Sequence, residues 1–198
     1  MKRIGLLLLL SLSVLFQAGA QSFYHNQLEI VRDQKSGNLG VKDTLGRLVI
    51  PCEYQRIWSA EVPGTPEQFR LILAARKRGS GQSVTLFLPD GSKATERKLN
   101  YAEIHMGAGP AEHRLIVGLV GEGYALMDED GNLLTERRYK EFGRGSRLDT
   151  PQEVTDFWGS RDGHYFLISP ADGHETGAFT FKKRDARGLF TGVKIRKF

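Results

Sequence analysis

The sequence predicts an all-β protein with four degenerate β-hairpin repeats of about 42 residues in one domain. Three observations lead to this fold class. Four turn glycines follow one another at intervals of 45, 40 and 42 residues, and they are Gly46, Gly91, Gly131 and Gly173. A proline followed by glutamate or glutamine and an apolar run recurs at a similar spacing. No stretch of residues 21–198 keeps a 3.6-residue apolar period through three helical turns, which argues against long amphipathic helices.

Each of the four glycines ends a turn of similar sequence, namely DTLG, LPDG, DEDG and PADG. A short apolar run that we expect to be a strand precedes each turn, at residues 39–42, 84–88, 124–127 and 165–169. An aromatic residue follows each turn. Tyr54, Tyr139 and Phe181 lie eight residues past their glycines, whereas Tyr101 lies ten past Gly91, which implies a two-residue insertion in the second unit.

The second repeated feature comprises the segments TPEQFRLILAA (65–75), GPAEHRLIVGL (109–119) and TPQEVTDFWGS (150–160). The tripeptide Arg-Leu-Ile occurs in the first two of them, 44 residues apart. Thr65 and Thr150, each followed by proline, fit the start of a single helical turn. Two independent features that recur with one period indicate a repeat architecture.

Each unit also contains a hairpin turn. The turns are expected at 36–38, 78–81, 121–123 and 162–163. The strongest is Asp162-Gly163, because glycine accepts the positive φ that a two-residue hairpin turn needs. A single hairpin is marginally stable, so successive hairpins should stack and share a core. The sequence allows an open stack or a small propeller-like closure completed by segment 27–33 or by the C-terminal tail.

The first twenty residues read as a secretory signal peptide. Lys2 and Arg3 precede an apolar run of thirteen residues, and Ala18-Gly19-Ala20 forms a small-residue cleavage signature. The run is shorter than the roughly 20 apolar residues of a membrane span. We therefore expect residues 21–198 to be a single exported domain, periplasmic or extracellular, without a transmembrane segment after cleavage.

The net charge of +5 is concentrated near the C-terminus, where residues 182–198 form a basic strand segment. A nucleic-acid-binding protein is expected to be basic more uniformly, so nucleic acid is not an expected partner. The candidate partner-binding residues are Lys182, Lys183, Arg184, Arg187, Lys194, Arg196 and Lys197. They could form a basic strand face that binds an anionic envelope component or an acidic protein. The simpler interpretation, which we favour, is a solvated edge strand, where lysines discourage edge-to-edge aggregation.

The first unit resembles the bacterial WG repeat, also called the KWG repeat. The family pattern runs Trp-Gly, an apolar pair, Asp, a turn with Gly, and an apolar run with Ile-Pro and Tyr. This chain follows it with Gly40-Val41, Asp43, Gly46, Ile50-Pro51 and Tyr54. The resemblance covers roughly residues 28–181. It implies a β-hairpin repeat or interaction protein without a shared catalytic centre.

The chain departs from this pattern in its other units. The third unit matches more loosely and the second and fourth keep mainly the turn glycine and the strand before it. The family tryptophan position holds Leu39, Val84, Tyr124 and Phe166. The glycine after it is kept only as Gly40. The resemblance therefore implies architecture more than activity.

We expect no catalytic, cofactor-binding or metal-binding residues. The segment from Asp128 to Asn132 lacks the EF-hand pattern, because its glycine is fourth and Tyr139 stands at the twelfth position. The five histidines form no HExxH motif, although His164 and His174 could approach one another. Cys52 is the only cysteine, and it is either a small buried apolar residue or an intermolecular disulfide partner.

Two tryptophans, Trp58 and Trp158, belong to the core or stack on a ligand. The leading functional hypothesis is an exported, non-catalytic interaction module that binds a protein or an envelope component. One alternative is a secreted hydrolase with a dispersed site of Asp, Glu and His residues. The other is a structural envelope protein attached through its basic tail.

Overall fold

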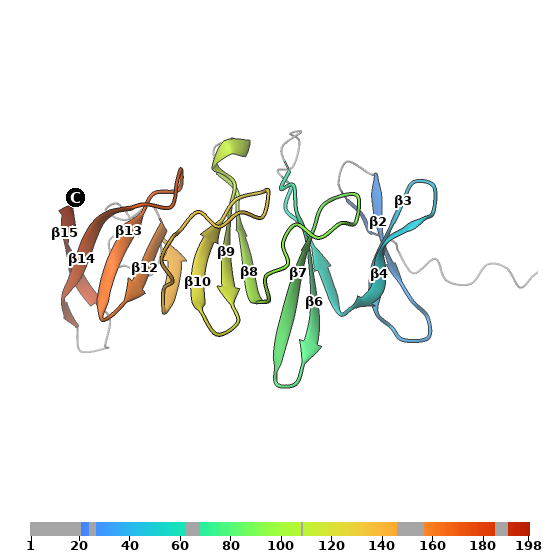
Figure 1. The fold of residues 1–198 in the computed structure, drawn as a ribbon, viewed down its shortest axis with the longest axis horizontal. Helices are drawn as coiled ribbons and strands as arrows, with labels where there is room; N and C mark the ends of the chain where they lie inside the picture. The colour runs from blue at the N-terminus through green and yellow to red at the C-terminus, as the bar shows by residue number, and fades with distance from the viewer. Residues whose placement is uncertain (1–20, 24–26, 62–67, 108, 146–156, 185–189) are drawn as a thin grey trace, which may run out of the picture.

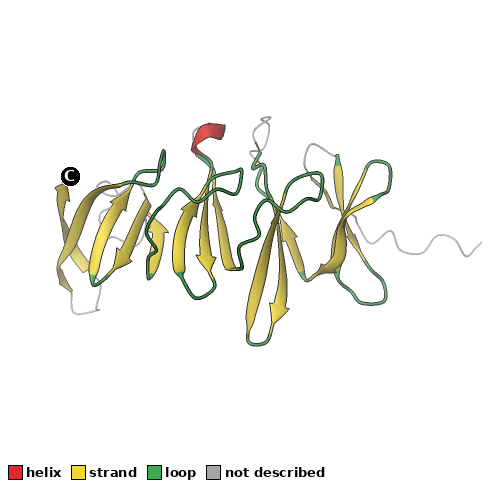
Figure 2. Ribbon diagram, in the orientation of Figure 1, coloured by secondary structure: helices red, strands yellow, loops and turns green. Residues whose placement is uncertain are grey.

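The computed structural model describes residues 21–23, 27–61, 68–107, 109–145, 157–184 and 190–198. These residues form three antiparallel sheets of four, six and five strands, and every strand pairs with its neighbours in chain order. The only helical element of the described residues is the 3₁₀ turn η1 (Pro110–Glu112) (Figure 2). The predicted all-β class is therefore confirmed. The signal peptide and the two helical turns predicted at Thr65 and Thr150 lie outside the described residues.

The first sheet contains β1 (Gln21–Phe23), β2 (Leu28–Arg32), β3 (Leu39–Asp43) and β4 (Leu48–Tyr54). The second contains β5 (Arg56–Trp58), β6 (Ile72–Arg78), β7 (Gly81–Phe87), β8 (Leu99–His105), β9 (Arg114–Leu119) and β10 (Gly123–Met127). The third contains β11 (Glu141–Arg144), β12 (Phe157–Arg161), β13 (His164–Ile168), β14 (Glu175–Arg184) and β15 (Phe190–Lys197).

The sheets follow one another along the long axis of the molecule (Figure 1). The first and third sheets lie at opposite ends, so neither segment 27–33 nor the C-terminal tail closes a ring. Of the two arrangements that the sequence allows, the structure has the open one.

The four predicted glycine turns all lie on one side of the molecule, which we call the turn side (Figure 1). All four glycines have positive φ, between 75° and 86°. The first three turns have the same two backbone hydrogen bonds. In the first turn, the Asp43 N–H donates to the carbonyl of Arg47, and the Gly46 N–H donates to the carbonyl of Asp43. The fourth turn is one residue longer and closes between Ser169 and His174.

The opposite side, which we call the tip side, holds the hairpin connections 33–38, 79–80, 120–122 and 162–163 (Figure 1). Their positions agree with the four predicted hairpin turns. Asp162 and Gly163 have φ of 52° and 77°. These angles fit the two-residue type I′ turn, which matches the twist of the flanking strands.

The chain bends on the tip side wherever it passes from one hairpin to the next. Strand β4 returns along β3, and after Gln55 the chain continues as β5 along β6. Segment 93–99 likewise returns along β7, and β8 then runs along β9. Each such passage ties two hairpins together through backbone hydrogen bonds.

The residue at each bend corrects one prediction. The pairs Leu39–Tyr54, Val84–Leu99 and Tyr124–Tyr139 occupy equivalent places before and after their turns. Leu99, eight residues past Gly91, is thus the counterpart of Tyr54 and Tyr139, and the two-residue insertion inferred from Tyr101 was wrong. All three bend residues are buried, and an aliphatic side chain fills this place as well as an aromatic one.

The fourth aromatic does not share this position. Phe181 continues in β14 and pairs with Val193 of β15. Instead of bending toward a further hairpin, the chain completes a long β14–β15 hairpin at the end of the molecule (Figure 1).

Three hydrophobic clusters lie in a row, one in each successive part of the stack. Strand β6 contributes to two of them, since Leu73 and Ala75 pack into the middle cluster and Ile72 and Ala74 into the first. Strand β9 does the same with Leu115 in the middle cluster and Ile116 in the third. A strand buried on both faces carries a continuous apolar run instead of an alternating one, which explains the RLILAA and RLIVGLV segments.

Three turn glycines also contact the part of the chain that precedes them. A Cβ at Gly91 would overlap the backbone of Val49, at Gly131 that of Ala94, and at Gly173 that of Leu134. Each contacted residue lies three positions past the preceding turn glycine. Successive turns therefore stack through direct backbone contact, which only glycine permits.

Candidate functional site

The structure distributes the predicted basic tail over two strands. Lys182, Lys183 and Arg184 end β14 on the tip side, and Lys194, Arg196 and Lys197 follow along the edge strand β15. Arg187 lies outside the described residues. The tail thus belongs to the third sheet, and its cations extend from the tip side toward the turn side.

The pairing register divides these cations between the two faces of the sheet. Thr180 pairs with Lys194 and Ala178 with Arg196, so Lys182 and Arg184 share the face of Lys194 and Arg196. Phe179, Phe181, Val193 and Ile195 share the other face with Lys183 and Lys197. Phe179 is buried and Arg196 is exposed. The register thus places four of the seven candidate residues at alternate positions of the two paired strands, and their role in binding stays a prediction.

A larger group of cations lies on the tip side, and we call it the basic rim. Its members are exposed and lie in or beside the hairpin connections and bends. They are Arg32, Lys35, Arg56, Arg76, Lys77, Arg78, Lys98 and Lys140. Two acidic residues nearby form ion pairs, Glu53 with Arg76 of the rim at 3.4 Å and Glu122 with Arg138 at 3.4 Å.

The β6–β7 hairpin tip is the densest part of the basic rim. It projects beyond the neighbouring strands (Figure 1) and carries Arg76, Lys77 and Arg78 in succession. The Arg56 guanidinium lies beside it, 4.4 Å above the ring of Trp58. A shallow hollow of about 810 Å³, open to solvent, is lined by Arg56, Arg76, Lys77 and neutral neighbours. This arrangement can bind an anionic surface or an acidic segment.

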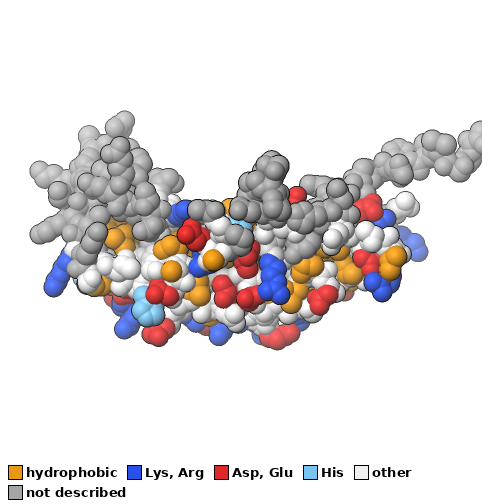
Figure 3. All heavy atoms as spheres, turned by 90° about the horizontal axis from the view of Figure 1, so that it is seen from above, with side chains coloured by type: hydrophobic (Ala, Val, Ile, Leu, Met, Phe, Trp, Pro, Cys, Tyr) orange, Lys and Arg blue, Asp and Glu red, His pale blue; other side chains and the backbone are white. Residues whose placement is uncertain are grey.

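The turn side has a different character. Acidic side chains recur along it among basic and hydrophobic ones (Figure 3). Several have structural roles, because Asp43, Asp90 and Asp172 accept backbone N–H groups within their own turns. Hydrogen bonds lower the pKa of all three carboxyl groups. The main donors are the Arg47 backbone for Asp43, the Ser92 side chain for Asp90 and the Ser169 side chain for Asp172. The main role of these three carboxylates is therefore to stabilise their own turns.

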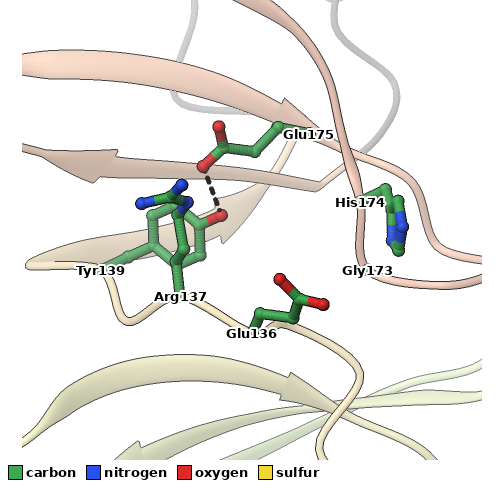
Figure 4. A pocket seen from close by; sticks show the side chains of 6 residues that line it. All are labelled: Glu136, Arg137, Tyr139, Gly173, His174 and Glu175. Carbon is green, nitrogen blue, oxygen red and sulfur yellow. Dashed lines mark hydrogen bonds between the residues drawn. The ribbon is translucent and has the colours of Figure 1, made fainter.

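A second hollow lies between segment 136–139 and the turn before β14 (Figure 4). The Tyr139 hydroxyl donates to Glu175 Oε1 at 2.9 Å. Arg161 donates to both Glu175 carboxylate oxygens at 2.9 Å, and its guanidinium lies 4.2 Å from the ring of Phe166. This network fastens the third hairpin to the third sheet, so its polar groups are engaged with one another.

The Tyr139 network predicts a dependence of stability on pH. Burial, followed by the hydrogen bond to Glu175, raises the pKa of Tyr139 above its ordinary value of 10.0. The folded state thus favours the neutral phenol, and the contribution is complete below pH 10.0 and is lost at higher pH. Tyr139→Phe should lower the free energy of unfolding by about 1 kcal/mol at pH 7.

The measurement is urea unfolding of both proteins between pH 7 and alkaline pH. The gap between Tyr139→Phe and the unsubstituted protein should narrow as pH rises beyond the ordinary tyrosine pKa. A gap that stays constant through this range would show that the phenol proton does not contribute.

The remaining singled-out residues are placed as follows. His164 and His174 lie at opposite ends of β13, so they do not approach one another as the sequence allowed, because an extended five-residue strand separates them. Cys52 is half-buried, and a Cβ at Gly40 would lie 2.7 Å from its Sγ. Trp158 is buried, whereas Trp58 is half-buried beneath Arg56.

Sequence reasoning missed the basic rim. The tripeptide Arg76-Lys77-Arg78 is visible in the sequence at the predicted turn 78–81, and it could have been singled out as a charged hairpin tip. Its gathering with Arg56 could not, because Arg56 approaches it only through the bend between the first and second hairpins.

The chain matches no protein-family model, no curated protein and no solved structure. Across the described part of the chain, no helix is long and apolar enough to span a membrane.

Proposed function

We propose that this protein is an exported, non-catalytic β-repeat module of the WG type that binds an acidic protein or envelope component through its basic rim. The observation that carries the proposal is the gathering of eight exposed cations on the tip side, with the β6–β7 tip projecting from it. Four stacked hairpin units present this surface along the length of the molecule.

Three features support the repeat. The hydrogen bonds of the first three glycine turns are equivalent. Three bend pairs recur in one register. The backbone contact between successive glycine turns also recurs three times. In each case a turn glycine meets the residue three positions past the preceding turn glycine. In such an architecture each unit contacts its neighbours, and the exposed rim forms an extended binding surface.

The buried and half-buried polar groups also support a scaffold. Tyr139, Glu175 and Arg161 bind one another across the junction between the third hairpin and the third sheet. At the surface, Arg70 Nη1 binds Asp130, and the Arg70 backbone N–H donates to Glu129 Oε1 at 3.0 Å. Ionisable side chains that meet in the fold thus hold successive hairpins together.

The proposal predicts weaker binding when charge is removed from the β6–β7 tip. The double variant Lys77→Ser with Arg78→Ser should bind about 30-fold more weakly to vesicles containing anionic lipid and to immobilised polyglutamate. Each cation near an anionic surface contributes about 1 kcal/mol to the binding free energy, and this variant removes two cations. The matched control is Arg47→Ser with Lys93→Ser, which removes two cations from the turn side and should leave binding nearly unchanged.

Each outcome bears on the proposal. Binding should weaken as salt rises, because exposed charges are screened within about 10 Å at 0.1 M. If the control pair weakens binding as much as the tip pair, net charge rather than the basic rim is responsible. Lys194→Ser with Arg196→Ser tests the tail in the same assay, and a loss confined to that variant would favour attachment through the tail.

A further inference from the structure

Arg114, the first residue of β9, is a buried cation with an unusual set of partners. Its side chain is 6% exposed. Nε donates to the carbonyl of Pro170, Nη2 to that of Ala171 at 3.3 Å, and Nη1 to that of His113 at 2.6 Å. Among the described residues, no carboxylate lies within ion-pair distance of this guanidinium. Uncharged carbonyls thus account for three of its five N–H groups.

A buried charge without a countercharge is costly, and a second cation makes the local excess larger. Arg114 and Arg144 of β11 line the same hollow on the turn side. The Arg144 guanidinium lies 5.5 Å from the ring centre of Phe157, and Arg144 is exposed. Two arginines therefore line one space of about 960 Å³ that is open to solvent.

Among the described residues, the rest of the lining is apolar apart from one carboxylate. Phe157, Pro170, Ala111 and Ala171 form apolar walls, and Gly107 leaves part of the wall without a side chain. The carboxylate belongs to Glu112, which is exposed at the border of the hollow. The described part of the site thus has a cationic end and apolar walls.

We propose that this hollow binds the carboxylate of a ligand with an apolar body, between Arg114 and Arg144. Guanidinium groups bind carboxylates through parallel N–H···O bonds, and Arg114 has two N–H groups beyond those that hold the turn. The apolar body of the ligand lies against the walls formed by Pro170 and Ala111. The site is separate from the basic rim and does not depend on the function proposed above.

Two sources supply this chemistry, a free organic acid and the C-terminus of a peptide that ends in an apolar residue. Isothermal titration of protein purified from cells expressing the full chain distinguishes them, with 3-phenylpropanoate and N-acetyl-alanyl-leucine as probes. The matched amides of both probes are the ligand controls. At least one free carboxylate should bind at least about tenfold more tightly than its amide, because a charge-assisted hydrogen bond is lost in the amide.

The decisive variant is Arg144→Gln, which removes an exposed cation and leaves the buried Arg114 in place. It should weaken binding of the carboxylate probe by about tenfold or more. Arg97→Gln, the same change at an exposed arginine outside the hollow, should change binding less than about twofold. Arg114→Gln is a second test where thermal unfolding shows that the variant still folds.

Binding of 3-phenylpropanoate alone would identify a free acid, and binding of the peptide alone would identify a chain terminus. Three results would overturn the proposal. The first is the absence of binding by either carboxylate up to about 10 mM, a concentration at which even a weak specific site is occupied. The second is equal binding of acids and amides, and the third is equal binding by Arg144→Gln and the unsubstituted protein.

Discussion

Replacement of Gly131 by alanine should lower the free energy of unfolding by about 3 kcal/mol, through left-handed strain and overpacking together. Gly131 has φ of 86°, a conformation that L-residues with a side chain rarely adopt. The added Cβ would also lie 2.6 Å from the backbone oxygen of Ala94. The preceding turn would have to move to relieve this contact, because the contacted atom belongs to the backbone.

The matched control for Gly131 is Gly46→Ala. Gly46 has φ of 77°, and a Cβ there would meet no atom within 4 Å. The backbone strain is therefore nearly the same in the two variants, and the stacking contact exists only at Gly131. Gly46→Ala should cost about 1 kcal/mol. Urea unfolding measures both free energies, and equal losses would show that the contact between successive turns contributes nothing to stability.

Truncation of either of two consecutive β6 residues should destabilise the protein by about 2–5 kcal/mol. Ile72 and Leu73 both have 0% exposure, and they lie on opposite faces of the strand in two different clusters. Ile72→Ala opens a cavity against the first sheet, and Leu73→Ala opens one in the middle cluster. In a sheet with one solvated face, one of two neighbouring positions would tolerate alanine.

The control for these truncations is Leu45→Ala, since Leu45 is 76% exposed in the first glycine turn. Its unfolding free energy should change by less than about 0.5 kcal/mol. If only one of the two β6 variants is strongly destabilised, the hairpin is packed on one face and the linear stack of three clusters is incorrect. Denaturant unfolding with matched m-values provides the comparison.

Much of the fold followed from local signals in the sequence. Asp162-Gly163 predicted a two-residue hairpin, and both residues have the positive φ that this turn needs. Gly131 and its counterparts predicted recurrent turns because glycine adopts left-handed backbone without strain. The aromatic spacing misled at Tyr101, because burial at the bend selects an apolar side chain and Leu99 meets that requirement.

The candidate sites were less accessible to sequence reasoning. The tail cations were visible as a charged run, and the face that each occupies came from the register of β14 with β15. The basic rim joins Arg56 to Arg76 and Lys77, about 20 residues further along the chain. The hollow at Arg114 joins residues from β9, β11 and the fourth glycine turn. No local pattern connects such positions.

The sequence by itself determined the all-β class, the period of the turns and the places where glycine is required, because turn geometry and strand preference depend on neighbouring residues. Only the tertiary structure decided that the stack is open, that β6 and β9 are buried on both faces, and that Arg114 and Arg144 line one hollow. These features depend on how each hairpin packs on the next, and packing brings together residues that are far apart in the chain.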